Sequence, residues 1–276
     1  AYTGQGGWPL TLLLTPDKKP FFAGTYFPPK NAYGSIGLDG LLQEAARLWK
    51  NDKAGCIASG DALTHAIQDK KGPGGHVSKE LLLEAQRQYS LSFDPVNGGF
   101  GSAPKFPSPH QLMFLLRQAY FEKSQRPLEI VETTLRQMYR GGIFDHIGFG
   151  FSRYSTDEKW LAPHFEKMLY DNALLIIAYC EAYQMTGNKL YRRVAEQTIQ
   201  YVLRDLSNPE GGFYSAQDAD SDGEEGAFYL FDKKELYEVL GPQADAFIQA
   251  YGITERGNFE GKNIPNQLHG AVRELP

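Results

Sequence analysis

Three glycine-led loops constrain the fold of this chain most strongly. They open at residues 97–101 (Asn-Gly-Gly-Phe-Gly), 141–146 (Gly-Gly-Ile-Phe-Asp-His) and 211–214 (Gly-Gly-Phe-Tyr), and each follows a stretch with helical character. The other connections between helical stretches are short. In a chain of helical hairpins, this alternation places all three long loops at the same end of the structure. Loops gathered at one end of a rigid scaffold commonly carry binding and catalysis, so we expect the function there.

Composition limits the class of protein. The chain has 276 residues, enough for one large or two ordinary domains. A hydrophobic content of 42% with 13% aromatic residues predicts a folded core. The net charge of −5 argues against nucleic-acid binding, which normally needs a basic surface. No apolar run approaches the length of a membrane span, so we expect neither nucleic acid nor membrane as a partner.

The two cysteines indicate the compartment. Cys56 and Cys180 lie far apart, and neither has a second cysteine or a histidine at ligand spacing. This pattern predicts two free thiols rather than a disulfide or a zinc site. We therefore expect a reducing, cytoplasmic location, no metal and no cofactor. The start at Ala1 and the end at Pro276 suggest an internal fragment of a longer protein.

The first part of the chain reads as a small α/β region. Residues 10–14 and 20–26 predict a β-hairpin around the turn at 15–19. Amphipathic helices are expected at 38–49 and 61–70. The Gly/Pro cluster that follows predicts a boundary between two domains, residues 1–72 and 76–276.

The second part reads as helical hairpins. Inner helices are expected at 110–122 and 165–183, the latter apolar nearly all round, and outer amphipathic helices at 128–140 and 190–206. Two such layers predict an incomplete α/α toroid. Ser78 is expected to cap a helix over 78–89, and Asp232 with Glu235 to cap another before Gly241. The predicted fold class is mixed: a partial α/β domain followed by a mainly α region.

Several segments carry a resemblance to a known family: residues 4–10 (Gly-Gln-Gly-Gly-Trp-Pro-Leu), 20–29, 98–107, 141–172 and 212–229. Through them the chain resembles the spermatogenesis-associated thioredoxin-domain proteins, which join a thioredoxin-like domain to a six-hairpin α/α toroid. The resemblance implies that residues 1–72 are the C-terminal half of the thioredoxin-like domain, with Pro9 as its structural cis-proline. The family's Cys-x-x-Cys site would lie upstream, so redox activity is not expected of this chain alone. The toroid is similar to those of sugar epimerases and glycosidases, which implies a carbohydrate function.

The densest group of candidate catalytic residues surrounds Pro163. We expect Pro163 to begin the inner helix, which would put His164 at its N-terminus and Lys167 and Asp171 on the same face. Asp171 interrupts an apolar run and needs a charge partner such as Lys167 or Arg153. The predicted acid–base residues are Asp145, His146, His164, Glu166, Asp171 and Asp218. The alternative is a structural network that ties the loops to the helix.

A second group of acidic residues follows the third glycine loop. Asp218, Asp220 and Asp222 fit the first half of a calcium loop, but Tyr229 stands where the closing glutamate would be. An EF-hand is therefore not expected, while a looser calcium site stays open. We expect Asp218 and Asp220 to face Asp145 or Asp171 across a cleft, as in glycosyl chemistry. Residues 221–225 are expected to be a solvated turn.

Flat apolar side chains beside polar ones suit a sugar ring. The predicted substrate contacts are Phe106, Arg153, Tyr154, Trp160, Lys167, Tyr170, Gln217 and Asp220. Three functions stay open. The first is an isomerase, epimerase or hydrolase that acts on a sugar-like small molecule. The second is a thiol-disulfide redox or chaperone-like protein whose helical part binds protein clients. The third is a non-catalytic scaffold.

Overall fold

The computed structural model describes residues 7, 9–32, 34–68, 72, 74–76 and 78–270. The chain divides into two compact units, residues 1–77 and 78–276. The expected cis bond at Pro9 involves Trp8 and so lies outside the described residues. Among the helices that the structure describes, none combines the length and apolarity needed to span a bilayer.

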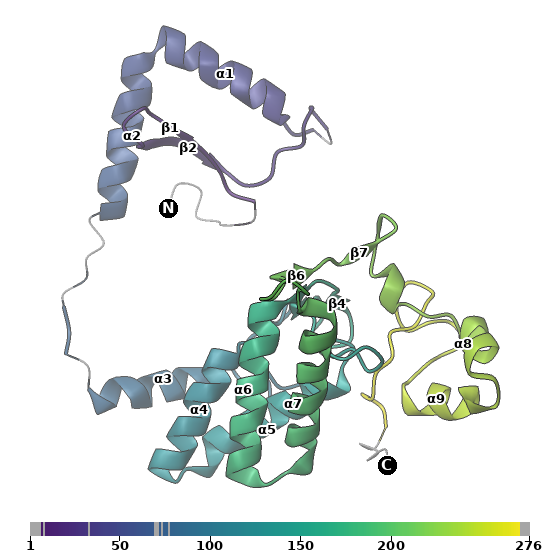
Figure 1. The fold of residues 1–276 in the computed structure, drawn as a ribbon. Helices are drawn as coiled ribbons and strands as arrows, with labels where there is room; N and C mark the ends of the chain where they lie inside the picture. The colour runs from purple at the N-terminus through teal and green to yellow at the C-terminus, as the bar shows by residue number, and fades with distance from the viewer. Residues whose placement is uncertain are drawn as a thin grey trace. The chain divides into compact units, whose positions relative to one another are not determined.

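The first unit is a hairpin followed by two helices (Figure 1). Strands β1 (Thr11–Leu14) and β2 (Pro20–Gly24) pair antiparallel, as predicted, and α1 (Leu38–Asn51) and α2 (Lys53–Gln68) follow. Helix α2 begins earlier than the expected start at residue 61. The first half of α2 contains glycine, whose low helix propensity explains why the sequence did not predict a helix there. A Cβ at Gly60 would lie 3.2 Å from Cβ of Lys19, so this glycine lets α2 approach the hairpin.

The second unit begins with a series of helices. They are α3 (Lys79–Ser92), α4 (Pro109–Glu122), α5 (Gln125–Arg140), α6 (Leu169–Thr186) and α7 (Lys189–Tyr201). Helix α4 packs against α5 and α6, and α6 packs against α7 (Figure 1). Helices α4 and α6 are therefore the expected inner pair, with α5 and α7 as their hairpin partners. Helix α7 continues into a π-helical turn, Val202–Leu206.

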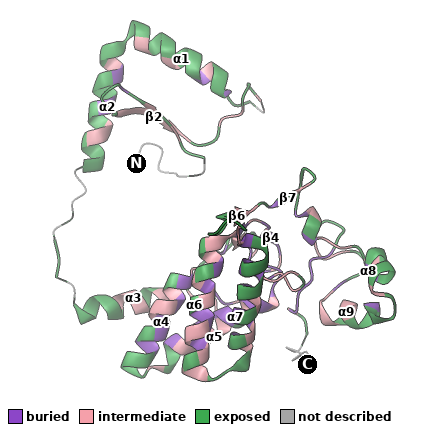
Figure 2. Ribbon diagram, in the orientation of Figure 1, coloured by how far each residue is buried: buried purple, intermediate pink, exposed green. Residues whose placement is uncertain are grey.

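The main core lies among α4, α5, α6 and α7 (Figure 2). A buried hydrogen bond from the Tyr179 hydroxyl to the Leu135 carbonyl, 2.7 Å long, ties α6 to α5. The fully buried side chains of this core include Leu112, Leu115, Ile130, Val131, Leu135, Met138, Leu175, Tyr179, Tyr191 and Val194.

One side of the inner helices is open. Tyr120 and Phe121 of α4 are 70% and 71% exposed, and Ile177 of α6 is 44% exposed. Helix α6 is nevertheless covered on its other faces by α4, α5 and α7, as the expectation of a helix buried on most sides requires. No described helix covers its exposed stripe, because the hairpins form only part of a ring. The fold class is as expected: mixed, with a mainly α, incomplete α/α toroid.

Short antiparallel strand pairs occupy the loop end. They are β3 (Tyr154–Ser155) with β4 (Pro163–His164), β5 (Lys167–Met168) with β6 (Ala216–Gln217), and β7 (Asp220–Ser221) with β8 (Glu224–Glu225). Helices α8 (Lys233–Leu240) and α9 (Ala244–Ala250) follow.

Two helix caps were expected, and one is formed. The Asp232 carboxylate accepts a hydrogen bond from the Glu235 backbone N–H at 2.8 Å, which confirms the predicted start of α8. Ser78 stands at the N-cap position of α3, but its side chain makes no capping hydrogen bond. That predicted capping role is wrong.

Candidate functional site

The three glycine loops meet at one end of the helical unit. Lys105 of the first loop and Ser155 of the second exchange backbone hydrogen bonds of 2.9 and 2.8 Å. The Leu169 N–H donates to the Ser215 carbonyl at 2.9 Å, which joins the second loop to the third. The predicted gathering of these loops is confirmed.

A buried lysine clamps the first loop. One oxygen of Asp94 accepts hydrogen bonds from the backbone N–H groups of Val96 and Asn97, at 2.9 and 3.0 Å. The other oxygen accepts one from Lys105 Nζ at 2.6 Å. Lys105 is fully buried, and its ammonium lies 5.7 Å from the ring centre of Trp160. These contacts make the Asp94–Lys105 pair a structural element of the loop.

The second loop repeats this arrangement with Asp145 and Lys167. Asp145 accepts from the backbone N–H groups of Ile147 and Gly148 at 2.9 and 2.8 Å, and from Lys167 Nζ at 2.8 Å. Lys167 is 2% exposed, and burial lowers the pKa of its ammonium while Asp145 opposes that fall. The predicted substrate contact of Lys167 is wrong, because its ammonium is enclosed. Asp145, predicted to be catalytic, holds donors on both oxygens.

Residues 163–168 are extended, which contradicts the expected helix start at Pro163. Helix α6 begins at Leu169, because the preceding backbone pairs with β3 and β6 instead. His164, Lys167 and Asp171 therefore do not share a helical face. Successive residues of an extended segment point to opposite sides. Phe165 and Lys167 are buried on one side, and His164 lies half-exposed with Glu166 on the other.

The half-exposed side carries a charged cluster. Arg153 Nη1 lies 2.9 Å from Glu166 Oε2. His164 Nε2 lies 3.9 Å from the same Glu166 oxygen, and His164 Nδ1 lies 2.5 Å from Glu225 Oε1. The imidazole is thus held between two carboxylates, and the guanidinium neutralises one of them.

Asp171 stands beside this cluster in the first turn of α6. It is half-buried and forms no hydrogen bond with any residue that the structure describes. Burial raises the pKa of Asp171 to about 6; the positive charge of Arg153 opposes the rise, and the negative charge of Glu166 adds to it. A carboxyl with a pKa near the working pH is suited to accept and release a proton.

Aromatic rings lie between the surface and these groups. Phe106 is 51% exposed, and its ring centre lies 4.9 Å from that of Tyr154. Tyr154 in turn stacks on the His164 imidazole, with ring centres 5.1 Å apart. Tyr170, 49% exposed, adjoins Arg153. We call the following set the loop-end site: Phe106, Arg153, Tyr154, His164, Glu166, Tyr170, Asp171 and Glu225.

Other predicted contacts lie elsewhere. Trp160 is fully buried and donates from Nε1 to the Asn97 carbonyl at 2.8 Å, so its predicted substrate contact is wrong. Gln217 is half-buried, and its side-chain oxygen accepts a hydrogen bond from the Tyr201 hydroxyl at 2.9 Å. Both side chains hold loops together.

The acidic segment after the third loop was expected to face Asp145 or Asp171 across a cleft, and that arrangement stays a prediction. Asp218 accepts a hydrogen bond from the Asp220 N–H at 3.1 Å. Within the described chain, no hydrogen bond or ion pair joins either residue to Asp145 or Asp171. Nor is any group of three or more His, Cys, Asp or Glu side chains of the described residues placed to hold a metal ion.

Glu225 is the site residue that sequence reasoning missed. The expected solvated turn over 221–225 is the exposed turn of the β7–β8 hairpin, but the hairpin also brings the Glu225 carboxylate onto His164, which the sequence did not predict. No signal in the sequence distinguishes Glu225 from Glu224, which stands next to it.

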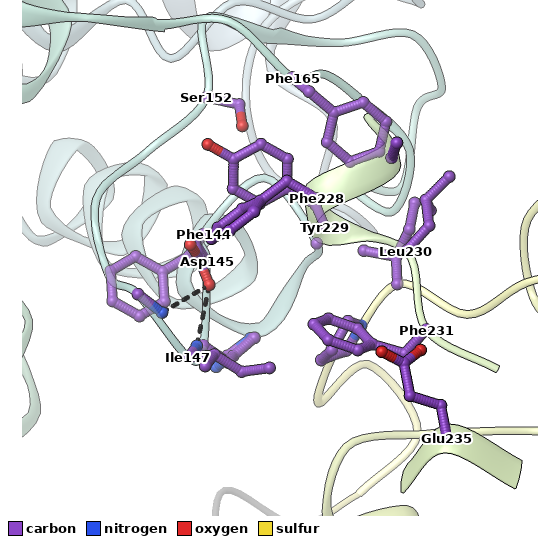
Figure 3. A pocket seen from close by; sticks show the side chains of 16 residues that line it. Phe144, Asp145, Ile147, Ser152, Phe165, Phe228, Tyr229, Leu230, Phe231 and Glu235 are labelled. Atoms are coloured by element: carbon purple, nitrogen blue, oxygen red, sulfur yellow. Dashed lines mark hydrogen bonds between the residues drawn. The ribbon is translucent and has the colours of Figure 1, made fainter. Parts of the chain in front are cut away.

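His146 lies apart from the loop-end site. Its ring packs against Tyr139, Phe144 and Tyr251. Burial lowers the pKa of His146 to about 4, although Asp145 opposes the fall, so the ring is neutral at pH 7. With Asp145 it lines a cavity of about 430 Å³ (Figure 3). The predicted catalytic residues are therefore divided between two places.

Comparisons of the sequence identify relatives. The model of a family named Thioredox_DsbH, described as a protein of unknown function (DUF255), matches residues 1–68. Spermatogenesis-associated protein 20 of Homo sapiens is 38% identical over 299 residues, which cover 98% of this chain and 38% of that protein. The Mus musculus protein of the same name is 37% identical with the same coverage. The chain thus spans about two fifths of these relatives' length.

Solved structures overlap with it only in part. The cellobiose 2-epimerase from Bacillus thermoamylovorans B4167 has a TM-score of 0.45 and 18% identity, over 53% of this chain and 44% of that one. A sugar epimerase from a ruminal bacterium has a TM-score of 0.44 and 14% identity, over 58% and 48%. These overlaps identify no substrate for this chain.

Proposed function

We propose a function from the premise that this chain belongs to the spermatogenesis-associated thioredoxin-domain family: its helical unit binds a small, carbohydrate-like molecule at the loop-end site and acts on it by acid–base chemistry. One observation carries the proposal. An imidazole, three carboxyls and a guanidinium converge beside partly exposed aromatic rings.

Each group has a role that suits its surroundings. Phe106 is exposed enough to stack on the apolar face of a sugar ring. Arg153, already paired with Glu166, offers remaining N–H donors to hydroxyl groups. Asp171 exchanges a proton with the substrate, and His164, oriented by Glu225, serves as the second acid–base group. An isomerase, an epimerase and a hydrolase would each need such a pair.

The test is a binding and turnover screen. Monosaccharides, disaccharides and polyols are titrated into the protein by calorimetry, and each binder is followed by NMR for epimerisation, isomerisation or hydrolysis. We expect saturable binding, on the order of tenfold weaker in His164→Asn, and turnover lost in Asp171→Asn with binding retained. Glu158→Gln and His76→Asn are matched controls, because both side chains are exposed and outside the site. A flat response to every sugar would refute the proposal.

The thioredoxin-family match over residues 1–68 favours a second candidate, a redox or chaperone-like protein. Cys56 and Cys180 are both free thiols, as the sequence predicted, which supports a reducing, cytoplasmic setting. The helical unit would then bind protein clients without catalysis. A Cys-x-x-Cys encoded upstream of residue 1, with disulfide-reductase activity that survives Asp171→Asn, would favour this candidate over the first.

A further inference from the structure

The cavity lined by Asp145 and His146 lies beside the same extended segment, on the side away from the loop-end site. Ser152 and Phe165 line the cavity, whereas their chain neighbours Arg153 and Glu166 belong to the loop-end site. This division follows from the alternation of an extended backbone. The cavity has a volume of about 430 Å³, within the range of small-molecule pockets.

The walls are apolar and mostly aromatic. Phe144, Phe165, Phe228, Tyr229 and Phe231 surround the space (Figure 3). Phe165 and Tyr229 stack almost parallel, with ring centres 5.5 Å apart, so one wall is flat and fixed. Apolar cavities that exclude water favour ligands with an apolar body.

The inner part of the cavity carries no unbalanced charge. Asp145 is neutralised by Lys167. The lowered pKa of His146 leaves that ring neutral at pH 7. The Ser152 hydroxyl makes no hydrogen bond with a described residue and remains available to a ligand. A charged group would therefore be disfavoured at this depth, whereas a ring with one polar atom would fit.

The mouth of the cavity carries one unmatched negative charge, Glu235. The Glu235 backbone N–H donates to the Asp232 carboxylate. The Glu235 carboxylate does not accept a hydrogen bond from the Asp232 backbone N–H in return, as it would in a capping box. Figure 3 shows the side chain reaching from α8 toward Phe231 instead. Among described residues, none forms a hydrogen bond or ion pair with this carboxylate.

The lysines next to Glu235 do not neutralise it, because both are engaged with other carboxylates. Lys233 Nζ lies 2.5 Å from Glu255, and Lys234 Nζ lies 3.6 Å from Glu238. Among the charged residues that line the cavity, only Glu235 therefore lacks a partner in the part of the chain that the structure describes.

We propose that this cavity binds a small amine: a molecule with a flat, preferably aromatic body among the phenylalanines and a protonated amino group at Glu235. A cation beside a carboxylate and an aromatic face gains from both contacts. The site is independent of the sugar chemistry proposed above, since it uses the other side of the 163–168 segment.

The probes are 2-phenylethylamine, 3-phenylpropionate and 2-phenylethanol, which share a phenyl ring and differ in charge. Binding to the protein is measured by calorimetry and ligand-observed NMR at pH 7. We expect the amine to bind about tenfold more tightly than the alcohol, and the carboxylate not to bind. Glu235→Gln should abolish the preference for the amine. Ala227→Leu should block all three probes by filling the cavity.

Two control variants make the result decisive. Glu158→Gln removes one exposed carboxylate outside the cavity and leaves the lysines of α8 paired, so it should leave binding unchanged. His164→Asn should also leave it unchanged, which separates this site from the loop-end site. Glu235 is exposed, so its variant is expected to fold even where Ala227→Leu does not. Equal affinity for amine and carboxylate, no saturable binding of the amine, or equal effects of Glu235→Gln and Glu158→Gln would overturn the proposal.

Discussion

Asp171 illustrates how a single side chain at the loop-end site opposes stability. Its carboxyl is half-buried without a hydrogen bond, and Glu166 adds a like charge nearby. The folded state therefore binds a proton more tightly than the unfolded state, whose aspartates titrate near pH 3.9. Residues that oppose stability in this way are commonly retained for function.

The first prediction follows from the sign of this shift. Between about pH 4 and 6 the folded protein holds a proton on Asp171 that the unfolded chain has lost, so stability falls as pH rises through this window. At pH 7 the cost is at most about 3 kcal/mol, since the pKa is raised by about two units. Asp171→Asn removes the titration, so it should stabilise the protein at pH 7 and be nearly neutral at pH 4.

Urea unfolding at both pH values measures this difference. The comparison must be between variant and wild type, because His146 adds the opposite slope to both proteins: its pKa is lowered to about 4, so its neutral form is lost as pH falls. An Asp171→Asn variant that is less stable than wild type at pH 7 would show that the carboxylate has a structural partner.

Some site residues could be read from the sequence and others could not. Phe106 and Tyr154 were predicted as substrate contacts because flat apolar side chains beside polar groups suit a sugar ring. The burial of Lys167 was not predicted because lysine is rarely buried; here Asp145 and the Phe149 carbonyl pair with its ammonium. Glu225 was missed because its contact with His164 depends on where a hairpin folds back.

At the scale of elements, the segment 163–168 shows why a strand was taken for a helix. A proline before an apolar run commonly marks a first helical turn, and Pro163 precedes such a run. The apolar–polar alternation typical of a strand is broken in the sequence at Lys167, because this charged residue occupies a buried position. The helices themselves were predictable, because their apolar faces repeat with the helical period.

The second prediction concerns the glycine loops as elements. Gly150 and Gly212 have nearly the same left-handed φ, +79° and +80°. A Cβ at Gly150 would lie 2.4 Å from Tyr201 Cδ1, whereas nothing lies within 4 Å at Gly212. Both alanine variants should lose about 1 kcal/mol to backbone strain. Gly150→Ala should lose a further ~2 kcal/mol, because Tyr201 is fully buried and cannot move aside.

Denaturant unfolding of the two variants tests this directly, with Gly212→Ala as the matched control for φ. Equal losses would mean that the second loop shifts away from Tyr201 at little cost. The loop would then not be held as rigidly as the Asp145–Lys167 pair implies.

At the scale of the whole molecule, the two compact units differ in how much apolar surface they bury. In the described part of residues 1–77, the buried apolar side chains are Leu41 and Cys56. Leu10, Leu12 and Leu14, which alternate along the hairpin, are 56%, 45% and 47% exposed. An isolated two-stranded hairpin is marginally stable in water. The helical unit, in contrast, encloses a continuous core around α4, α5, α6 and α7.

The third prediction is that the two units open independently, as the two-domain reading of the sequence also requires. Amide hydrogen exchange at pH 7 should be fast in α1 and α2 and slowest in the buried turns of α5 and α6, because local opening costs least where few apolar contacts must be broken. Val131→Ala in α5 should speed exchange within the helical unit and leave α1 and α2 unchanged, since Val131 is fully buried in that core. Leu41→Ala in α1 is the reciprocal control. If either substitution accelerated exchange in both units equally, the chain would unfold as one cooperative body, and the hairpin unit would owe its stability to the helical one.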